Sequence, residues 1–168
     1  RTDGVSTTAL LGRMLSMSKS HLGSYIFNSS SFLASTRKIV QFSSRRAPAP
    51  TDKIVYTAGA FDLLHAGHVS FLKEAKAKGD YLIVGVYGDI DVNRRMGGNY
   101  PIMNIMERVL NLLSLRYVDE VIIGAPFYIS EDVLNSLRID VVCRGVGPVF
   151  LFPGEADPCE LAKKRGIY

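Results

Sequence analysis

Between Asp52 and Cys143 the chain alternates between short apolar runs and longer segments in which apolar residues recur every three or four positions. The short runs are bounded by polar or glycine-containing turns and predict strands at 53–57, 81–86, 120–123 and 140–143. The helical spacing predicts helices at 67–78, 102–115 and 130–137. We expect a loop at 88–99, a loop and a short helix within 154–166, and the start of a fifth strand at Ile167 and Tyr168.

The predicted strands are apolar throughout and do not alternate with polar residues, so both faces of each strand are expected to be buried. Strands that alternate with helices favour a parallel sheet with helices on both sides and right-handed crossovers. The sequence therefore predicts an α/β fold built on a Rossmann-like, doubly wound parallel sheet. Ligands bind such sheets beyond the carboxyl ends of the strands, so the loops there should carry the chemistry.

The first predicted strand leads directly into a turn that carries two histidines. The turn starts at Gly59 and ends in a His-x-Gly-His spacing, formed by His65, Gly67 and His68, where the next helix begins. Free backbone N–H groups and the positive end of the helix dipole meet at such a point, which favours phosphate binding. Gly67 removes a side chain where a phosphate would approach the backbone. We predict that both histidines donate to ligand phosphates, and that Phe61 is buried while Asp62 accepts backbone N–H groups of the turn.

The loops after the other predicted strands carry further candidates. Asp89 and the pair Arg94 and Arg95 follow the second strand, and Arg144 and Gly145 follow the fourth. The carboxyl ends of parallel strands share one edge, so we expect these residues near the histidines. Arg94 and Arg95 are as compatible with a solvated surface pair as with a ligand contact.

The composition indicates a globular protein and argues against several other classes of function. The 168 residues are 47% hydrophobic and 21% charged, which is typical of a globular protein, and the net charge is +4. Much of the positive charge lies beside prolines in 37–50, so we prefer a solvated basic linker to a nucleic-acid interface. Cys143 and Cys159 lack metal-ligand spacing and are interpreted as intracellular thiols. No apolar run is long enough for a transmembrane helix, and we expect a cytoplasmic protein, alternatively one peripheral to the endoplasmic reticulum.

The run from Gly59 to His68 resembles the signature of the cytidylyltransferases in the HxGH nucleotidyltransferase superfamily. The pair Glu107-Arg108 and the run from Arg116 through Asp119 to Val121 resemble the branch that acts on phosphocholine, phosphoethanolamine and glycerol 3-phosphate. The resemblance covers nearly the whole chain. It implies the nucleotidyltransferase version of the predicted fold and a nucleotide site formed by Gly59, Ala60, Phe61, Gly67, Arg116, Arg144 and Gly145. It adds Arg108 and Asp119 to Asp89, Arg94 and Arg95 as candidates for the nucleotide, the substrate or a dimer contact.

A second motif of that family stands near the start of the chain. The residues Arg1, Thr2, Gly4, Ser6 and Thr7 form an Arg-Thr-x-Gly-x-Ser-Thr pattern, which follows the last strand of a family member and contacts the CTP phosphates. Here the pattern precedes the histidines, which suggests a tandem protein. We expect residues 1–23 to end a preceding domain, 24–51 to be a linker, and 52–168 to be a cytidylyltransferase-like domain truncated before its own copy of the motif.

The resemblance implies nucleotidyl transfer from CTP to phosphoethanolamine, giving CDP-ethanolamine and pyrophosphate for phospholipid synthesis. Mg²⁺ would accompany the triphosphate without a dedicated protein site, and the partners would be a preceding repeat and, in a dimer, a second copy. The family has His-Gly after the fourth strand where this chain has Arg144-Gly145, so a catalytically incomplete nucleotide-binding repeat is an alternative. An adenylyltransferase of the same superfamily is the second alternative.

Overall fold

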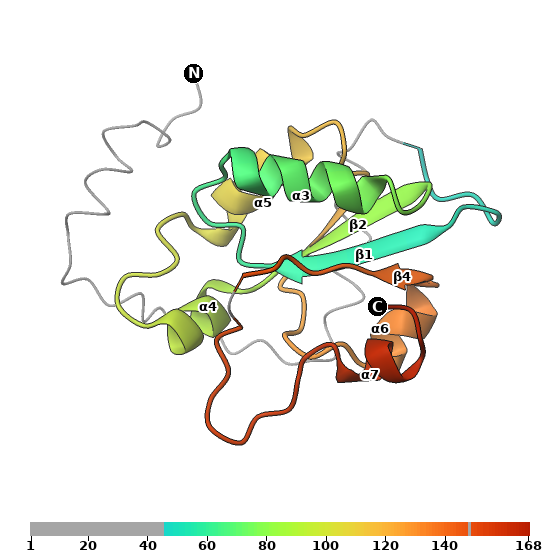
Figure 1. Ribbon diagram of the computed structural model, residues 1–168. Coiled ribbons are helices and arrows are strands. Elements are labelled where there is room, and N and C mark those ends of the chain that lie inside the picture. Colours follow the sequence, from blue (N-terminus) through green and yellow to red (C-terminus); the bar gives the residue numbers. More distant parts are fainter. Residues whose placement is uncertain (1–45, 148) are drawn as a thin grey trace.

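The computed structural model describes residues 46–147 and 149–168, and these form a single parallel sheet with helices on both faces (Figure 1). The strands are β1 (Ile54–Gly59), β2 (Tyr81–Val86), β3 (Glu120–Ile123) and β4 (Val141–Val142), in the spatial order β3-β2-β1-β4. The helices are α3 (Ala66–Lys76), α4 (Asp89–Met96), α5 (Ile105–Leu113), α6 (Glu131–Ser136) and α7 (Glu160–Lys164). This confirms the predicted α/β class and the doubly wound parallel sheet.

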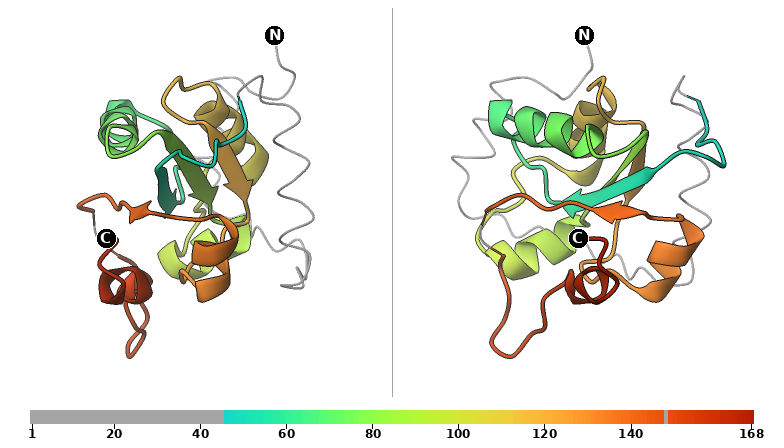
Figure 2. Two further views of the ribbon diagram at one scale, coloured as in Figure 1. Left: turned by 90° about the vertical axis from the view of Figure 1, so that its right-hand side faces the viewer. Right: turned by 45° about the vertical axis from the view of Figure 1, so that its right-hand side comes forward.

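The sheet separates two apolar layers (Figures 1 and 2). Helices α3 and α5 cover one face, where Leu72 and Leu112 pack on Val55 and Val84. Helices α6 and α7 cover the other face. All six residues of β2 are buried, as expected for the strand between β1 and β3. None of the described helices has the length and apolar character needed to cross a membrane.

Aspartates tie the amino-terminal edge of the sheet together. The side chain of Asp119, just before β3, accepts the N–H of Leu82 in β2 at 2.8 Å. In the same way Asp140, just before β4, accepts the N–H of Ile54 in β1 at 2.7 Å. Each carboxylate satisfies an N–H near the start of a strand, and the pattern fixes neighbouring strands against each other.

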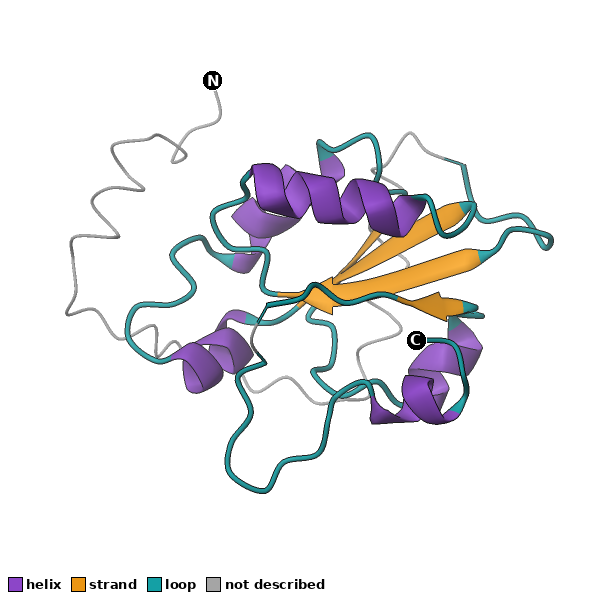
Figure 3. Cartoon of the chain, in the orientation of Figure 1, coloured by secondary structure: helices purple, strands orange, loops and turns teal. Residues whose placement is uncertain are grey.

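Two expectations about elements need correction (Figure 3). The segment expected to be a loop at 88–99 contains helix α4, of which only Val92 is buried. It therefore lacks the apolar period that reveals a helix, although Asp89 in its first turn and Arg95 in its last turn suit the helix dipole. The fifth strand is also not formed: Val142 N–H donates to Ile167 O at 2.6 Å, but 167–168 remain a non-strand segment.

Candidate active site

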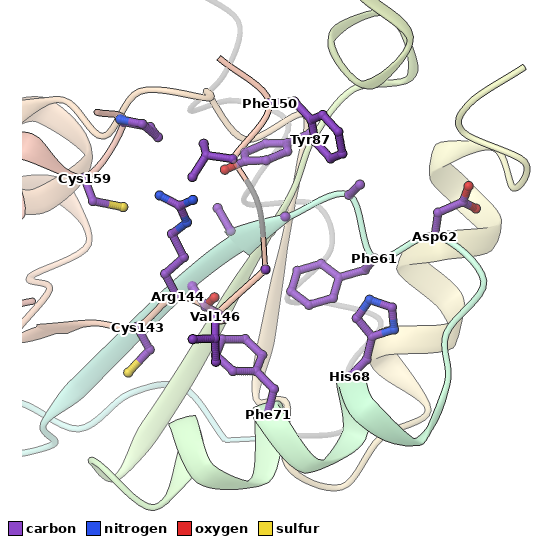
Figure 4. A pocket seen from close by; sticks show the side chains of 18 of the residues that line it. Phe61, Asp62, His68, Phe71, Tyr87, Cys143, Arg144, Val146, Phe150 and Cys159 are labelled. Carbon is purple, nitrogen blue, oxygen red and sulfur yellow. The ribbon is translucent and has the colours of Figure 1, made fainter. Parts of the chain in front are cut away.

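A pocket of about 680 Å³ opens at the carboxyl ends of β1 and β4. The chain leaves β1 toward β2 on one side, while β4 lies on the other side, so this is the point where the strand order reverses. Open α/β sheets bind their ligands at such switch points. Figure 4 shows Phe61, His68 and Phe71 on one side of the pocket, with Arg144, Phe150 and Tyr87 across from them.

The turn after β1 is held in a strained conformation by Asp62. Phe61 and Leu63, on either side of it, have positive φ angles of 49° and 44°, a conformation that costs non-glycine residues about 1 kcal/mol each. The Asp62 carboxylate accepts the N–H of Ile102 at 2.6 Å, of Met103 at 2.9 Å and of Leu63 at 3.0 Å. Phe61 is buried, at 6% exposure. Both predictions for the turn are confirmed.

The two histidines cap helix α3 and each other. The Nδ1 atom of His65 accepts the N–H of Gly67 at 3.1 Å, and Nδ1 of His68 accepts the N–H of His65 at 3.4 Å. This reciprocal arrangement is a capping box in which imidazoles replace the usual Ser and Glu. The rings lie close, with 4.1 Å between centroids.

The capping box determines which ring nitrogen carries the proton. An Nδ1 atom that accepts a hydrogen bond is unprotonated, so the proton of each neutral ring is on Nε2. Each histidine can therefore present an Nε2–H donor. The pKa of His68 is lowered, mainly by burial and then by the neighbouring His65, which favours this neutral form near pH 7.

Gly67 and Gly59 have a second role besides backbone approach. A Cβ atom at Gly67 would lie 2.8 Å from Cε1 of His65 and 3.0 Å from its Nδ1. A Cβ atom at Gly59 would lie 3.1 Å from Cε2 of the Phe61 ring. Both glycines line the pocket, as does Ala60. They leave room for the rings that shape the site.

Arg108 stabilises the backbone segments next to the pocket. Its side chain is fully buried and donates to the carbonyls of Ala60, Tyr87 and Met103. It also pairs with the Asp89 carboxylate at 2.6 Å. Neither Arg108 nor Asp89 lines the pocket. Together they fix the turn after β1 against the segment after β2.

Arg116 and Asp119 lie at the opposite edge of the sheet, where β3 begins, and the fold does not bring them to the pocket. Arg116 is exposed and stacks on Tyr117, with 4.9 Å from its guanidinium carbon to the ring centroid. Asp119 bonds Leu82 N–H and Lys76, which is the structural role described above. A parallel connection must return the chain to the amino-terminal edge before the next strand, so residues just before β3 face away from the ligand edge.

Arg144 and Gly145 do line the pocket, as predicted from their position after β4. Arg144 is partly buried and lies 3.7 Å from the Asp157 carboxylate. Arg95 lines the pocket as well, whereas its neighbour Arg94 is exposed and does not. The expected domain boundary at 23 and most of the expected linker lie outside the described residues. The same holds for the remaining sequence candidates, which are Arg1, Thr2, Gly4, Ser6 and Thr7.

Several pocket residues escaped the prediction. One group follows the histidines along α3, and the other comes from loops distant in sequence: Ser70, Phe71 and Glu74, then Tyr87, Phe127, Val149, Phe150 and Cys159. The first group had a readable signal, because residues three and four positions after Gly67 share a helix face with it. In the second group, Tyr87 and Phe127 follow β2 and β3 and so lie at the expected edge of the sheet. Val149, Phe150 and Cys159 had no such signal, since only the fold brings their loop to the end of β1.

Comparison with known proteins agrees with this geometry. The family model described as Cytidylyltransferase-like matches residues 56–168, and the chain therefore belongs to this family. It is 50% identical to the ethanolamine-phosphate cytidylyltransferase of Dictyostelium discoideum over 190 aligned residues, which cover the whole chain and 53% of that protein. It is 39% identical to the ethanolamine-phosphate cytidylyltransferase of Mus musculus, covering the whole chain and 52% of that protein. The chain thus spans about half the length of these relatives.

Two other relatives show the breadth of the fold. The FAD synthase of Thermococcus sibiricus is 44% identical over 111 residues, covering 66% of this chain and 73% of that protein. A lipopolysaccharide core biosynthesis protein from Thermoplasma volcanium has a similar solved structure, with a TM-score of 0.54 and 28% identity over 68% of this chain and 87% of that one.

Proposed function

We propose that this chain binds CTP in the pocket and transfers its cytidylyl group to phosphoethanolamine, giving CDP-ethanolamine and pyrophosphate. The observation that carries the proposal is the 50% identity to an ethanolamine-phosphate cytidylyltransferase across the whole chain. The pocket supports it, because the two capping histidines lie at the N-terminus of α3 and line that pocket. In this proposal the product serves phospholipid biosynthesis.

The reaction is a substitution at phosphorus. A phosphate oxygen of phosphoethanolamine attacks the α-phosphorus of CTP, a new P–O bond forms, and the bond to the β-phosphate oxygen breaks as pyrophosphate leaves. Negative charge builds up on the non-bridging oxygens, and donors fixed in advance stabilise it. The Nε2–H groups of His65 and His68 are such donors, since their Nδ1 atoms are held by the capping box.

The remaining pocket residues supply binding and not bond-making. Arg144 offers the cation nearest β4, and Gly59 and Gly67 allow close approach along the turn. Mg²⁺ stays a proposal: the described residues contain no group of three His, Cys, Asp or Glu side chains that would hold a metal ion. The ion would be bound chiefly by the triphosphate of CTP.

The proposal extends to the wider protein. We propose that its partners are a preceding cytidylyltransferase repeat in the same polypeptide and, in a dimer, a second copy of this chain. We also propose a cytoplasmic location. The proposed preceding repeat rests on the sequence motif at Arg1 to Thr7 and on the similarity to longer relatives.

Ligand binding and turnover separate the candidates. CTP should raise the melting temperature of the 168-residue chain more than ATP does at equal concentration, with GTP as the control. A larger increase in melting temperature with ATP would favour the adenylyltransferase alternative, which the similarity to an FAD synthase leaves open. CTP binding without formation of CDP-ethanolamine, measured with labelled CTP, would favour a catalytically incomplete nucleotide-binding repeat. That alternative is suggested by Arg144, which stands where the family has a histidine.

A further inference from the structure

Arg95, in the last turn of α4, reaches across to the loop between β4 and α7. Its guanidinium pairs with the Glu155 carboxylate through two contacts, of 2.8 Å and 3.3 Å, and donates to the carbonyl of Phe150 at 3.2 Å. The Glu155 carboxylate also accepts the N–H of Phe152 at 2.9 Å. One ion pair thus fixes both the backbone carbonyl of Phe150 and the carboxylate that folds the loop back on itself.

Aromatic rings enclose this ion pair. The guanidinium carbon of Arg95 lies 3.3 Å from the centroid of Phe127, which follows β3, and 5.4 Å from that of Phe152. The Arg95 side chain is only 12% exposed and the Glu155 side chain 23%. A stacked guanidinium that also forms a two-contact carboxylate pair is fixed in position far better than an exposed surface pair. Hydrogen bonding to Arg95 lowers the pKa of Glu155 to about 2, so the carboxylate remains charged at physiological pH.

The loop that this pair holds is a wall of the pocket. Val146, Val149 and Phe150 line it from the loop, and Phe71 lines it from α3. The segment 145–154 contains no charged side chain, and Phe150 and Phe152 are 47% and 41% exposed. Its apolar contacts are therefore incomplete, and the Arg95–Glu155 pair supplies a specific attachment to α4. Figure 4 shows Phe150 beside Tyr87 within this wall.

We propose that Arg95 and Glu155 are positioning residues: their ion pair holds residues 149–158 over the pocket, and the nucleotide site is formed only while that pair is intact. The proposal rests on the nucleotide function proposed above. It differs from a direct role of Arg95, in which Glu155 merely occupies the arginine until a ligand phosphate replaces it.

The two roles predict opposite effects of removing the carboxylate charge. If Arg95 acts on the ligand, Glu155→Gln frees the guanidinium and CTP should bind more tightly. If the pair positions the loop, Glu155→Gln releases the wall and the Kd for CTP should rise about fivefold to tenfold, as expected for loss of a charge-assisted hydrogen bond. Arg95→Gln should weaken binding by a similar factor, and the double variant by no more than the more affected single variant.

A tryptophan at position 152 reports on the loop without any ligand. The 168-residue chain contains no tryptophan, so Phe152→Trp gives a single emitter beside Arg95. Adding Glu155→Gln to this variant should shift the emission to longer wavelength as the ring becomes more hydrated. Glu160→Gln is the matched control, because Glu160 forms an exposed pair with Lys164 one turn away on α7. It should change neither the emission nor the affinity.

CTP affinity and tryptophan emission together distinguish failure of the positioning role from failure of the proposed nucleotide function. Tighter CTP binding by Glu155→Gln, unchanged affinity in Glu155→Gln and Arg95→Gln, or additive losses in the double variant would each overturn the positioning role. Unshifted emission in the tryptophan background would overturn it as well. Absence of CTP binding by the unmodified chain would instead contradict the proposed nucleotide function, and the emission shift would still decide whether the pair holds the loop.

Discussion

At the scale of single residues, His65 and His68 combine two tasks that are usually separate. Their Nδ1 atoms form the capping box of α3, and both side chains line the pocket. A histidine here is therefore both a structural cap and a candidate donor in the reaction. Substitutions that keep one task and remove the other can separate the two.

Asn and Gln substitutions separate capping from donation. His65→Asn keeps a good N-cap, and His68→Gln keeps the reciprocal bond of the capping box, so neither should lower the stability by more than about 0.5 kcal/mol. His65→Ala should cost about 1 kcal/mol, since it removes the cap. If the site is catalytic, all three should reduce formation of CDP-ethanolamine at least about 100-fold, the scale of losing one transition-state donor. Thermal unfolding and turnover of the same preparations check both parts; a fully active His65→Asn would rule out the donor role.

The lowered pKa of His68 makes stability depend on pH. In the folded state His68 binds a proton less readily than in the unfolded chain, where its pKa is near 6.5. The unfolded state therefore binds more protons between the two values, and the free energy of unfolding should rise with pH there. The contribution is complete above about pH 6.5 and is lost as pH falls through the folded pKa. Urea titrations from about pH 7.5 to about pH 5, which bracket that window, should show a smaller dependence on pH for His68→Gln than for the unmodified chain; equal dependence would contradict the assignment.

At the scale of elements, the two edges of the sheet have different roles. The amino-terminal edge is tied by aspartates that accept strand N–H groups, while the carboxyl edge opens into the pocket. Asp119 belongs to the family-like run that starts at Arg116, yet it lies at the amino-terminal edge. Lys76 at the end of α3 forms an ion pair with it, which joins that helix to the start of β3.

Asp119→Ala should therefore affect stability and not the ligand. The variant leaves the N–H of Leu82 without its partner and Lys76 without its anion, and we expect a loss of about 1–3 kcal/mol. CTP affinity should stay within about twofold of the unmodified chain under conditions where the variant is folded, because the site lies at the other edge. Denaturant unfolding and calorimetric titration provide the two measurements. Asp119→Asn is the control, because its amide oxygen can still accept the N–H.

At the scale of the whole molecule, the sheet is packed so closely around Gly85 that no larger side chain fits there without a shift. A Cβ atom at Gly85 in β2 would lie 2.6 Å from the hydroxyl of Tyr56 and 2.7 Å from Cβ of Ala125. The Tyr56 hydroxyl is buried and has no hydrogen-bond partner among the described residues. Burial raises the pKa of Tyr56, so this group stays neutral.

Gly85→Ala should destabilise the fold by about 1–3 kcal/mol, the usual range for overpacking a core. Tyr56→Phe should be neutral or stabilising, because it removes a buried hydroxyl that makes no bond. The double variant should recover part of the loss, since one of the two contacts disappears. Melting curves of the three variants test this; a clearly destabilised Tyr56→Phe would show that the hydroxyl has a partner in solution.

Local patterns along the chain were enough to predict the parallel sheet, the turn after β1, the buried Phe61 and a helix that starts at the two histidines. Apolar runs, turn residues and the spacing of a helix start are all properties of neighbouring residues, so they can be read without the fold. Ser130 at the start of α6 was predictable for the same reason, and its side chain does accept the N–H of Val133. The family relationship rests instead on the resemblance of the motif from Gly59 to His68 and on the comparisons.

Which charged residues reach the pocket depends instead on how the chain folds. Arg108 and Asp89 are bonded to each other beneath the pocket, while Arg116 and Asp119 lie at the far edge. Helix α4 carries no apolar period, and the loop that closes the pocket comes from more than fifty positions further along the chain, where Glu155 meets Arg95 at a separation of 60 residues. A sequence records the spacing of such groups along the chain, but their pairing depends on crossovers that bring distant segments to one edge.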